Sequence, residues 1–544
     1  MNAPTQAPEF PVTWRDPADA AHTWFRDAMH FPAPVTPLTA SFLSDALEPG
    51  VTAACEAMHS PLAALRHASF GGWVYNCPVP AVPPAEMEGR IAEHMPVMTD
   101  HMDNLRRRWD TEYLPRVVRL TGEIDALDFS GDAESAAAAL DLLVAHNVEI
   151  WRIHFLVVFP KLGAGERFSA IYMQAAGAAD EMDPYRCLQG LPNKSLEADR
   201  ALWQLAQDAR ATPGLAETLV SGAPADGLEA LDHSPEGRAW RERFSAFLDT
   251  YGQRAQAMDL SAPTWAEEPA FAIETLRRFL IAGAGDPEGQ RERLLAESEA
   301  LVDAARARID DPGLRAAFDG ALEVARATWP LEEDHAFYID QRSLAGATRR
   351  AFLRLAVALV GQGRLAAVED VWFLGIDDLR AGIAGQELAG RVRDARREHA
   401  ASSLLDAPPF IGVPPDPDAP VDPGLVKFFG RPGPPEVDER VLRGSAGSRG
   451  RAEGVARVVR SVDELHRLQA GEILVCRSTT PPWTPAFASI AALVTDTGGV
   501  LAHGAIVARE YAIPAVMGTK VGTRVIQDGQ RITVDGDTGT VFLA

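Results

Sequence analysis

A single histidine near the C-terminal end stands among small residues. In TDTGGVLAHGAIVAREYAIPAVMG, His503 is flanked by Ala502 and Gly504, with Gly498 and Gly499 shortly before it. The run AALVT predicts a buried strand that enters a glycine loop, and HGAIVAREYA predicts a short helix, so His503 would lie at a helix N-terminus. That position favours a bound phosphate, and a neutral imidazole is a competent nucleophile near physiological pH. The spacing by itself favours a plain helix cap, because a Gly-Gly loop with one histidine is a weak signal, and it leaves phosphoryl transfer open.

Two further stretches contain groups that could act on the acceptor of that phosphate. EEDHAFYIDQR offers a base for a hydroxyl group and a cation for phosphoryl oxygens within three helical turns. HNVEIWRIHFLVVFPK places two histidines two turns apart, followed by a lysine. The expected acceptor-binding residues are Glu333, Asp334, His335, Tyr338, Arg342, His154 and Lys161. A polar helix start and hydrogen-bonded core histidines explain the same residues equally simply.

No metal site is predicted in either stretch. The two histidines of HNVEIWRIHFLVVFPK come with no H-E-x-x-H pattern and no third ligand at suitable spacing.

The stretch around His503 is similar to the phosphohistidine motif of the phosphoenolpyruvate-utilising enzyme mobile domain, the swivelling domain of several dikinases. The resemblance extends from GSAGSRGRAEGVARVV through GEILVCRSTTPPWTPAF to DGQRITVDGDTGTVFL. It implies that His503 is phosphorylated and then used as the donor. Family members often carry Ser or Thr just before the histidine, so Ala502 lacks a hydroxyl that could bind the phosphate. The loop residues expected around the phosphate are Thr497, Gly498, Gly499, Gly504 and Arg509.

The preceding region has a looser resemblance to the helical substrate domain of rifampin phosphotransferase and to phenylphosphate synthase-type phosphotransferases. PVTWRDPADAAHTWFRDAMHFPAPVTPL, WPLEEDHAFYIDQRSLAGATRRAF and VEDVWFLGIDDL carry it. The resemblance implies a phosphotransferase subunit that acts on a small organic hydroxyl, and a phenolic compound is the expected acceptor. The alternatives are an antibiotic or another alcohol as acceptor, and a non-catalytic phosphocarrier or regulatory protein.

The sequence offers no nucleotide-binding pattern to load the histidine. The first 440 residues contain no G-x-x-x-x-G-K-[ST] loop. Their strand–helix alternation is too short for a (β/α)₈ barrel, and they lack the β-rich runs of an ATP-grasp domain. We therefore expect an ATP-grasp partner subunit that supplies ATP and Mg²⁺, with ATP split to AMP and phosphate. No cofactor is expected to bind tightly to this chain.

Composition limits the other partners and the location. The formal charge of −24 opposes nucleic acid or an anionic membrane as the main partner. The four cysteines are scattered, the N-terminal residues show no secretory signal, and no run approaches the roughly 18 apolar residues of a membrane span. These features predict a cytoplasmic protein.

The elements that position these residues fall into a helical region followed by a β-rich one. RERLLAESEALVDAARARI and ATRRAFLRLAVALVGQGRL have helical periodicity, and SAAAALDLLVAHNVEIWRIHFLVVF predicts a helix that Pro160 ends. GVARVV, EILVC, AALVT, AIPAVMG and RITVDGDTGTVFL predict strands, the last a hairpin at Asp-Gly. The predicted fold is a large, mostly α-helical domain (1–405), a proline-rich linker (406–443) and an α/β phosphohistidine swivelling domain (444–544).

Overall fold

The chain forms two compact units that are each built from separate stretches of sequence. The computed structural model describes residues 10–543, apart from 177–179, 181, 283–285, 417–425, 428–429, 431–432, 434, 439 and 480–482. Unit 1 contains Met1–Pro160, Ala257–Ala262 and Tyr338–Pro420, and unit 2 contains Lys161–Gln256, Pro263–Phe337 and Val421–Ala544. The predicted division at residues 405 and 443 stays a prediction, because one arrangement does not test which segment moves. Much of the predicted linker lies outside the described residues.

Unit 1 combines helices with a small sheet. Its four strands are ordered β2-β3-β1-β4 and pair antiparallel. The predicted mostly helical character of this region is confirmed, but no strand was predicted here, so this small sheet is additional. Strands β2 and β3 form a hairpin because Gly71 and Gly72 both take positive φ angles, which glycine adopts without a Cβ clash. The bounds are η1 Pro17–Ala21, β1 Thr23–Arg26, α1 Pro37–Phe42, η2 Leu43–Leu47, α2 Glu48–Ala57, β2 Leu62–Phe70, β3 Trp73–Pro80, η3 Pro84–Glu86, α3 Met87–Arg108, η4 Trp109–Tyr113, α4 Leu114–Asp125, α15 Arg349–Gly361, η7 Val368–Phe373, α16 Ile376–Ile383, α17 Ala389–Ser402 and β4 Phe410–Gly412.

Helix α5 (Ala133–Ala176) begins in unit 1 and continues into unit 2 through Pro160. The prediction that the helix ends at this proline is wrong. Among the described residues, α5 is the one helix long and apolar enough to cross a membrane by length and composition, whereas the sequence pattern predicted no such run. Core helices pass the same test, and α5 has fully buried Leu140, Ile150 and Phe168.

The helical part of unit 2 packs around two apolar clusters. One cluster joins Phe168 of α5 and Phe318 of α13 with Ile506 of α20, so α20 packs directly on the helices. The predicted helix in RERLLAESEALVDAARARI is confirmed as α12. The bounds are α6 Asp183–Arg186, α7 Lys194–Ala211, α8 Leu215–Val220, α9 Pro224–Ala230, η5 Leu231–His233, α10 Pro235–Tyr251, α11 Ala270–Ala282, α12 Pro287–Arg306, α13 Pro312–Thr328 and α14 Leu331–Ala336, after which η6 Phe337–Thr348 leads back into unit 1.

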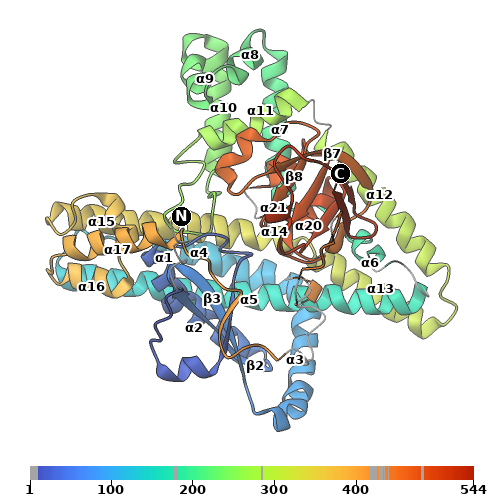
Figure 1. Cartoon of the computed structure of the whole chain (residues 1–544), viewed down its shortest axis with the longest axis horizontal. Coiled ribbons are helices and arrows are strands. Elements are labelled where there is room, and N and C mark those ends of the chain that lie inside the picture. Colours follow the sequence, from blue (N-terminus) through green and yellow to red (C-terminus); the bar gives the residue numbers. More distant parts are fainter. Residues whose placement is uncertain are drawn as a thin grey trace, which may run out of the picture. The chain divides into compact units, whose positions relative to one another are not determined.

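The C-terminal part of unit 2 is an eight-stranded mixed sheet, ordered β5-β12-β11-β7-β8-β9-β10-β6. Its strands β7 and β8 are labelled in the red part of Figure 1. Strands β7, β8, β9 and β10 are parallel neighbours, whereas β11 and β12 form the predicted hairpin. All five predicted strand runs are confirmed, and so is the predicted fold class. The bounds are β5 Val441–Arg443, β6 Ser445–Ser448, β7 Arg451–Val458, η8 Val462–Arg467, β8 Ile473–Cys476, α19 Thr484–Phe487, β9 Ala492–Thr495, α20 His503–Glu510, β10 Ala515–Met517, α21 Gly522–Val525, β11 Arg531–Asp535 and β12 Thr540–Leu543.

Candidate functional site

His503 is the first residue of helix α20, as the sequence predicts. The fully buried strand β9 leads into the loop 496–502, and Ala502 is the N-cap residue with an extended backbone and no side-chain cap. Asp496 fixes the start of this loop because its carboxylate accepts hydrogen bonds from the backbone N–H (2.9 Å) and the hydroxyl of Thr523. The histidine is therefore presented by a braced turn at the positive end of a helix.

Three of the predicted loop glycines leave no room for a side chain. Gly498 has a φ of +91°, and a Cβ on it would lie 2.8 Å from the Cβ of Ala502. A Cβ on Gly499 would lie 2.2 Å from the carbonyl oxygen of Lys427, and one on Gly504 would lie 2.4 Å from Oγ1 of Thr479. The small residues around the histidine thus serve close packing of the loop, besides any access for a ligand.

The imidazole of His503 has little polar support. Its Nε2 lies 3.4 Å from the hydroxyl of Thr484, and its buried Nδ1 has no hydrogen-bond partner. The side chain keeps part of its surface accessible, but the surrounding protein still desolvates the ring. Desolvation, reinforced by the positive charge of Arg254, lowers the pKa of His503 to about 4, against the opposing effect of Glu332. At neutral pH the ring is uncharged and keeps a lone pair for nucleophilic attack.

Arg254 is a buried cation within electrostatic range of His503. It follows helix α10, is only 2% exposed, and its guanidinium stacks 5.2 Å from the ring centre of Trp265. Its Nε and Nη1 atoms have no hydrogen-bond partner, and no carboxylate forms an ion pair with it among the described residues. A buried guanidinium with unpaired N–H groups is suited to an incoming anion, because binding satisfies donors that burial has desolvated.

Lys161 and Glu332 form a partly buried ion pair within electrostatic range of the histidine. Nζ of Lys161 lies 2.7 Å from Oε2 of Glu332 and 4.4 Å from the ring centre of Trp329, and Lys161 is only 1% exposed. Burial raises the pKa of Glu332, but attraction to Lys161, His335 and His503 outweighs it, so the net pKa is lowered. Glu332 therefore links the predicted acceptor residues to the predicted nucleophile.

The neighbouring residues of helix α14 have different surroundings. Glu333 is buried and accepts a hydrogen bond from the Ser195 hydroxyl, and burial raises its pKa. Nδ1 of His335 donates to the Leu331 carbonyl at 2.5 Å, which places the ring's lone pair on Nε2, and burial lowers its pKa. Asp334 instead accepts a hydrogen bond from the backbone N–H of Lys194 at 3.0 Å, which stabilises the start of helix α7. His335 thus has the properties of a neutral base.

Two more carboxylates lie close to Arg254 or at the end of helix α20. Asp199 of α7 accepts a hydrogen bond from the Tyr511 hydroxyl at 2.8 Å, and burial raises its pKa. Burial also raises the pKa of Glu510 to about 7, although the backbone N–H of Gly190 donates to it. At a pKa of about 7, Glu510 is partly protonated near neutral pH, which reduces the negative charge that an anionic ligand would meet in this region.

Two predicted loop residues hold the backbone in this arrangement. The Thr497 hydroxyl donates to the Arg477 carbonyl at 3.1 Å. Nη1 of Arg509 donates to the carbonyls of Val500 and Gly447, at 2.8 and 2.9 Å. Arg509 is 4% exposed and burial lowers its pKa to about 10. Their contact with phosphate stays a prediction, and their contacts here brace the histidine loop.

The remaining predicted acceptor residues belong to unit 1. There His154 lies 3.7 Å from Asp340, Tyr338 packs its ring near Trp109, and Arg342 is exposed. The structure thus brings Lys161, Glu333 and His335 together with His503 in unit 2. For the three residues of unit 1, a role at the acceptor site stays a prediction.

Two known protein domains match this chain, one over the histidine loop and one over the helices around Arg254 and Glu332. Residues 468–539 match the PEP-utilising enzyme, mobile domain, and residues 164–333 match the rifampicin phosphotransferase fourth domain. The chain carries a PEP-utilising mobile domain. His503 and its glycine loop lie within the mobile-domain match, whereas Arg254, Glu332 and the helices around them lie within the fourth-domain match.

The relatives of this mobile-domain protein are longer than the chain. Over 98% of its length it is 33% identical to chondramide synthase cmdD of Chondromyces crocatus, of which it covers 14%. Over 95% of its length it is 31% identical to uncharacterized phosphotransferase YvkC of Bacillus subtilis, of which it covers 61%. A rifampicin phosphotransferase of a Streptomyces species is 34% identical over 60% of the chain, which covers 37% of that relative.

Several residues around the mobile-domain histidine were not found from the sequence. Thr479 and Thr484 lie in RSTTPPWTP, shortly before strand β9. The hydroxyl residues and prolines of this segment were a signal in the sequence that it could contribute to the site. Arg254 lies in the turn YGQRAQ and has no such signal, because its position depends on how the turn folds between α10 and α11. The role of Glu332 as the ion-pair partner of Lys161 depends on a contact across 171 positions of sequence.

Proposed function

We propose that this chain is a phosphotransferase subunit that carries phosphate on His503 to a small organic hydroxyl. The single observation that carries the proposal is the pairing of a neutral, poorly hydrogen-bonded imidazole with a buried, unpaired guanidinium at Arg254. An uncharged nitrogen can attack phosphorus, and a buried cation stabilises the charge on the phosphoryl oxygens. Relatives named as phosphotransferases support the same class of reaction.

In the first half-reaction, a lone pair of the His503 ring attacks phosphorus, a P–N bond forms, and the P–O bond to the donor breaks. We propose that ATP with Mg²⁺ is the donor, bound by an ATP-grasp partner. His503 would receive the β-phosphoryl group with AMP as the leaving group, and water would cleave the bond to the γ-phosphate and release it as inorganic phosphate. The nucleotide patterns missing from the first 440 residues support a separate donor site. Arg254 would then pair with the phosphoryl oxygens of the phosphohistidine.

In the second half-reaction, an acceptor hydroxyl attacks the same phosphorus, the P–N bond breaks, and the hydroxyl proton moves to a base. His335 is the proposed base, because its Nδ1 is committed to Leu331 and burial keeps its Nε2 uncharged. Lys161 would keep Glu332 ionised beside the histidine and share in stabilising the transferred charge. A phenolic acceptor suits a single positioned base, because a phenol has a pKa of about 10.

The names of several relatives favour a second candidate acceptor. Rifampicin phosphotransferases of Streptomyces and Bacillus match 60% or more of the chain. Incubation of the loaded chain with phenol in one reaction and rifampicin in another, followed by mass measurement of the product, separates the two candidates. Phosphorylated rifampicin and unreacted phenol would remove the phenolic assignment while keeping the phosphotransferase.

The proposal is tested by following phosphate through both half-reactions. The chain, ATP labelled at the β-phosphate and the partner subunit should give an acid-labile, base-stable label, and His503→Ala should give none. The chain with ATP alone should release no AMP. Labelling of the alanine variant at the level of the unmodified chain would remove His503 from the reaction, and AMP release without a partner would remove the two-subunit scheme.

A further inference from the structure

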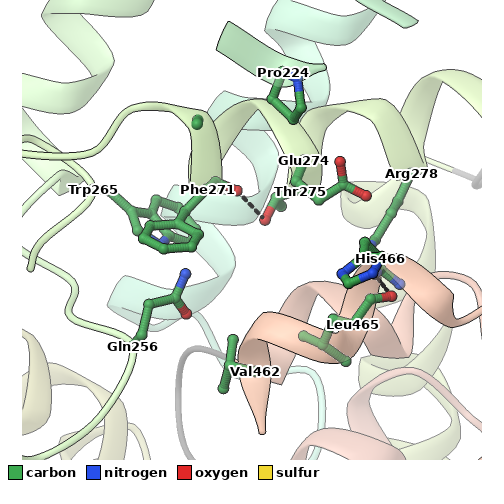
Figure 2. Close-up of a pocket in the computed structure, with 11 residues that line it drawn as sticks. Pro224, Gln256, Trp265, Phe271, Glu274, Thr275, Arg278, Val462, Leu465 and His466 are labelled. Carbon is green, nitrogen blue, oxygen red and sulfur yellow. Dashed lines mark hydrogen bonds between the residues drawn. The ribbon is translucent and has the colours of Figure 1, made fainter. Parts of the chain in front are cut away.

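A cavity of about 270 Å³ lies within unit 2, between helix α11 and the 3-10 helix η8 (Figure 2). Phe271 of α11 and Val462 and Leu465 of η8 form apolar walls. A cavity of about 150 Å³ is enough for benzene, so this one has room for an aromatic ring with substituents at both ends.

The two ends of the cavity carry polar atoms of different kinds. At one end, Oε1 of Gln256 and Nε1 of Trp265 are buried and have no hydrogen-bond partner (Figure 2). At the other end, Nη1 of Arg278 is likewise buried and unpartnered. Trp265 is 3% exposed and Arg278 is 9% exposed, so water does not readily satisfy these groups. Buried polar atoms of native proteins normally have a partner, and three unpartnered ones around one cavity indicate a ligand.

Arg278 makes its end of the cavity selective for an anion. Its Nη2 donates to the Leu465 carbonyl at 2.5 Å, which fixes the guanidinium and leaves Nη1 at the cavity wall. Glu274 is the nearby acidic side chain, but Arg278 forms no ion pair among the residues that the structure describes. A carboxylate would supply the missing charge partner through a charge-assisted hydrogen bond.

Gln256 and Trp265 make the opposite end selective for a hydroxyl group. The indole N–H can only donate and the amide oxygen can only accept. A hydroxyl both accepts and donates, so one such group satisfies both atoms. An ether oxygen or a chlorine substituent would leave the oxygen of Gln256 unpaired.

We propose that this cavity binds a small hydroxyaryl carboxylate, with its carboxylate on Arg278 and its hydroxyl between Trp265 and Gln256. The ring lies against Phe271, Val462 and Leu465. Since α11 lies in the helical part of unit 2 and η8 lies in the C-terminal part that contains the sheet, the bound molecule contacts both parts. The site uses none of the residues assigned to phosphoryl transfer.

The test uses 4-hydroxybenzoate as the probe, with benzoate and 4-hydroxybenzyl alcohol as partners that each lack one group. Calorimetric titration of the full chain should show saturable binding of 4-hydroxybenzoate, about tenfold tighter than either partner. Arg278→Gln should abolish the preference over the alcohol, and Gln256→Leu should abolish the preference over benzoate. Arg293→Gln removes an exposed positive charge of α12 and should change nothing.

Two further variants keep the outcome decisive. Val462→Trp should block binding by filling the cavity from η8, even where Arg278→Gln does not fold. His503→Ala should bind 4-hydroxybenzoate normally, so failure of phosphoryl transfer and failure of this site remain distinguishable. Three outcomes would each overturn the assignment. They are no saturable binding up to about 10 mM, equal binding of all three compounds, and unchanged binding preferences in the Arg278 and Gln256 variants.

Discussion

The hydroxyl oxygen of Thr484 lies 3.4 Å from Nε2 of His503, and it is the one polar contact of that ring among the described residues. Such a contact is long for a hydrogen bond, so it directs the imidazole without binding it tightly. We expect Thr484→Val to slow phosphorylation of His503 about tenfold, roughly the cost of one lost hydrogen bond. Thr484→Ser should restore the rate, and equal rates for the valine and serine variants would contradict an orienting role.

Arg254 should act on His503 through its charge. Its positive charge helps to lower the pKa of His503, so Arg254→Gln should move that pKa upward from about 4. The same change should reduce phosphoryl transfer by about a hundredfold or more, because a desolvated cation opposite developing charge is lost. An NMR titration of the imidazole measures the shift. A large loss of transfer with an unchanged pKa would indicate a folding defect in place of the electrostatic role.

Lys161 and Glu332 should be coupled in stability but not in activity. Lys161→Met leaves the partly buried carboxylate of Glu332 unpaired and should cost up to about 3 kcal/mol of unfolding free energy. Adding Glu332→Gln should recover much of that loss, because it removes the unpaired charge. Denaturant unfolding measures the stability, and transfer to acceptor should remain impaired in the double variant. Recovery of both properties together would make the ion pair purely structural.

The close packing of the histidine helix can be tested with a pair of glycines. Gly504→Ala would place a Cβ 2.4 Å from Oγ1 of Thr479, and we expect it to cost about 1–3 kcal/mol of stability. Gly320→Ala in helix α13 meets no atom within 4 Å and should stabilise the chain by about 0.5–1 kcal/mol. Thermal unfolding of both variants provides the comparison. A stable Gly504→Ala protein would show that Thr479 moves aside freely.

The depressed pKa of His503 should make stability depend on pH. Between about pH 6.5 and 4 the unfolded chain binds a proton at this residue that the folded chain does not. This contribution is fully present above pH 6.5 and is lost as pH falls toward 4, by up to about 3 kcal/mol. His503→Asn should remove that part of the pH dependence. Urea unfolding of both proteins at pH 6.5 and at pH 4 measures the change of unfolding free energy with pH. An equal change in the two proteins would contradict the lowered pKa of His503.

The sequence was most informative where local pattern decides the structure. The strand, glycine loop and helix around His503 follow from short-range periodicity and from backbone conformations that only glycine tolerates easily. The same reasoning failed at Pro160, where packing of a long core helix outweighs the missing hydrogen bond, and at the unit 1 sheet, whose pairing of β1 with β4 joins distant segments. It also missed Arg254, because a lone arginine in a turn gains its role only from tertiary burial.

Lys427, in the segment expected to be a linker, holds the histidine loop from outside. Its carbonyl accepts the N–H of Leu501 at 2.8 Å, its backbone sits where a Cβ on Gly499 would be, and its amino group pairs with Glu166 at 2.6 Å. If the proposed phosphoryl transfer moves this loop away from the helices, these contacts must break first. In that proposal, the strength of the contacts made by Lys427, more than the length of the segment, would set how long the phosphohistidine stays beside the helices before it moves.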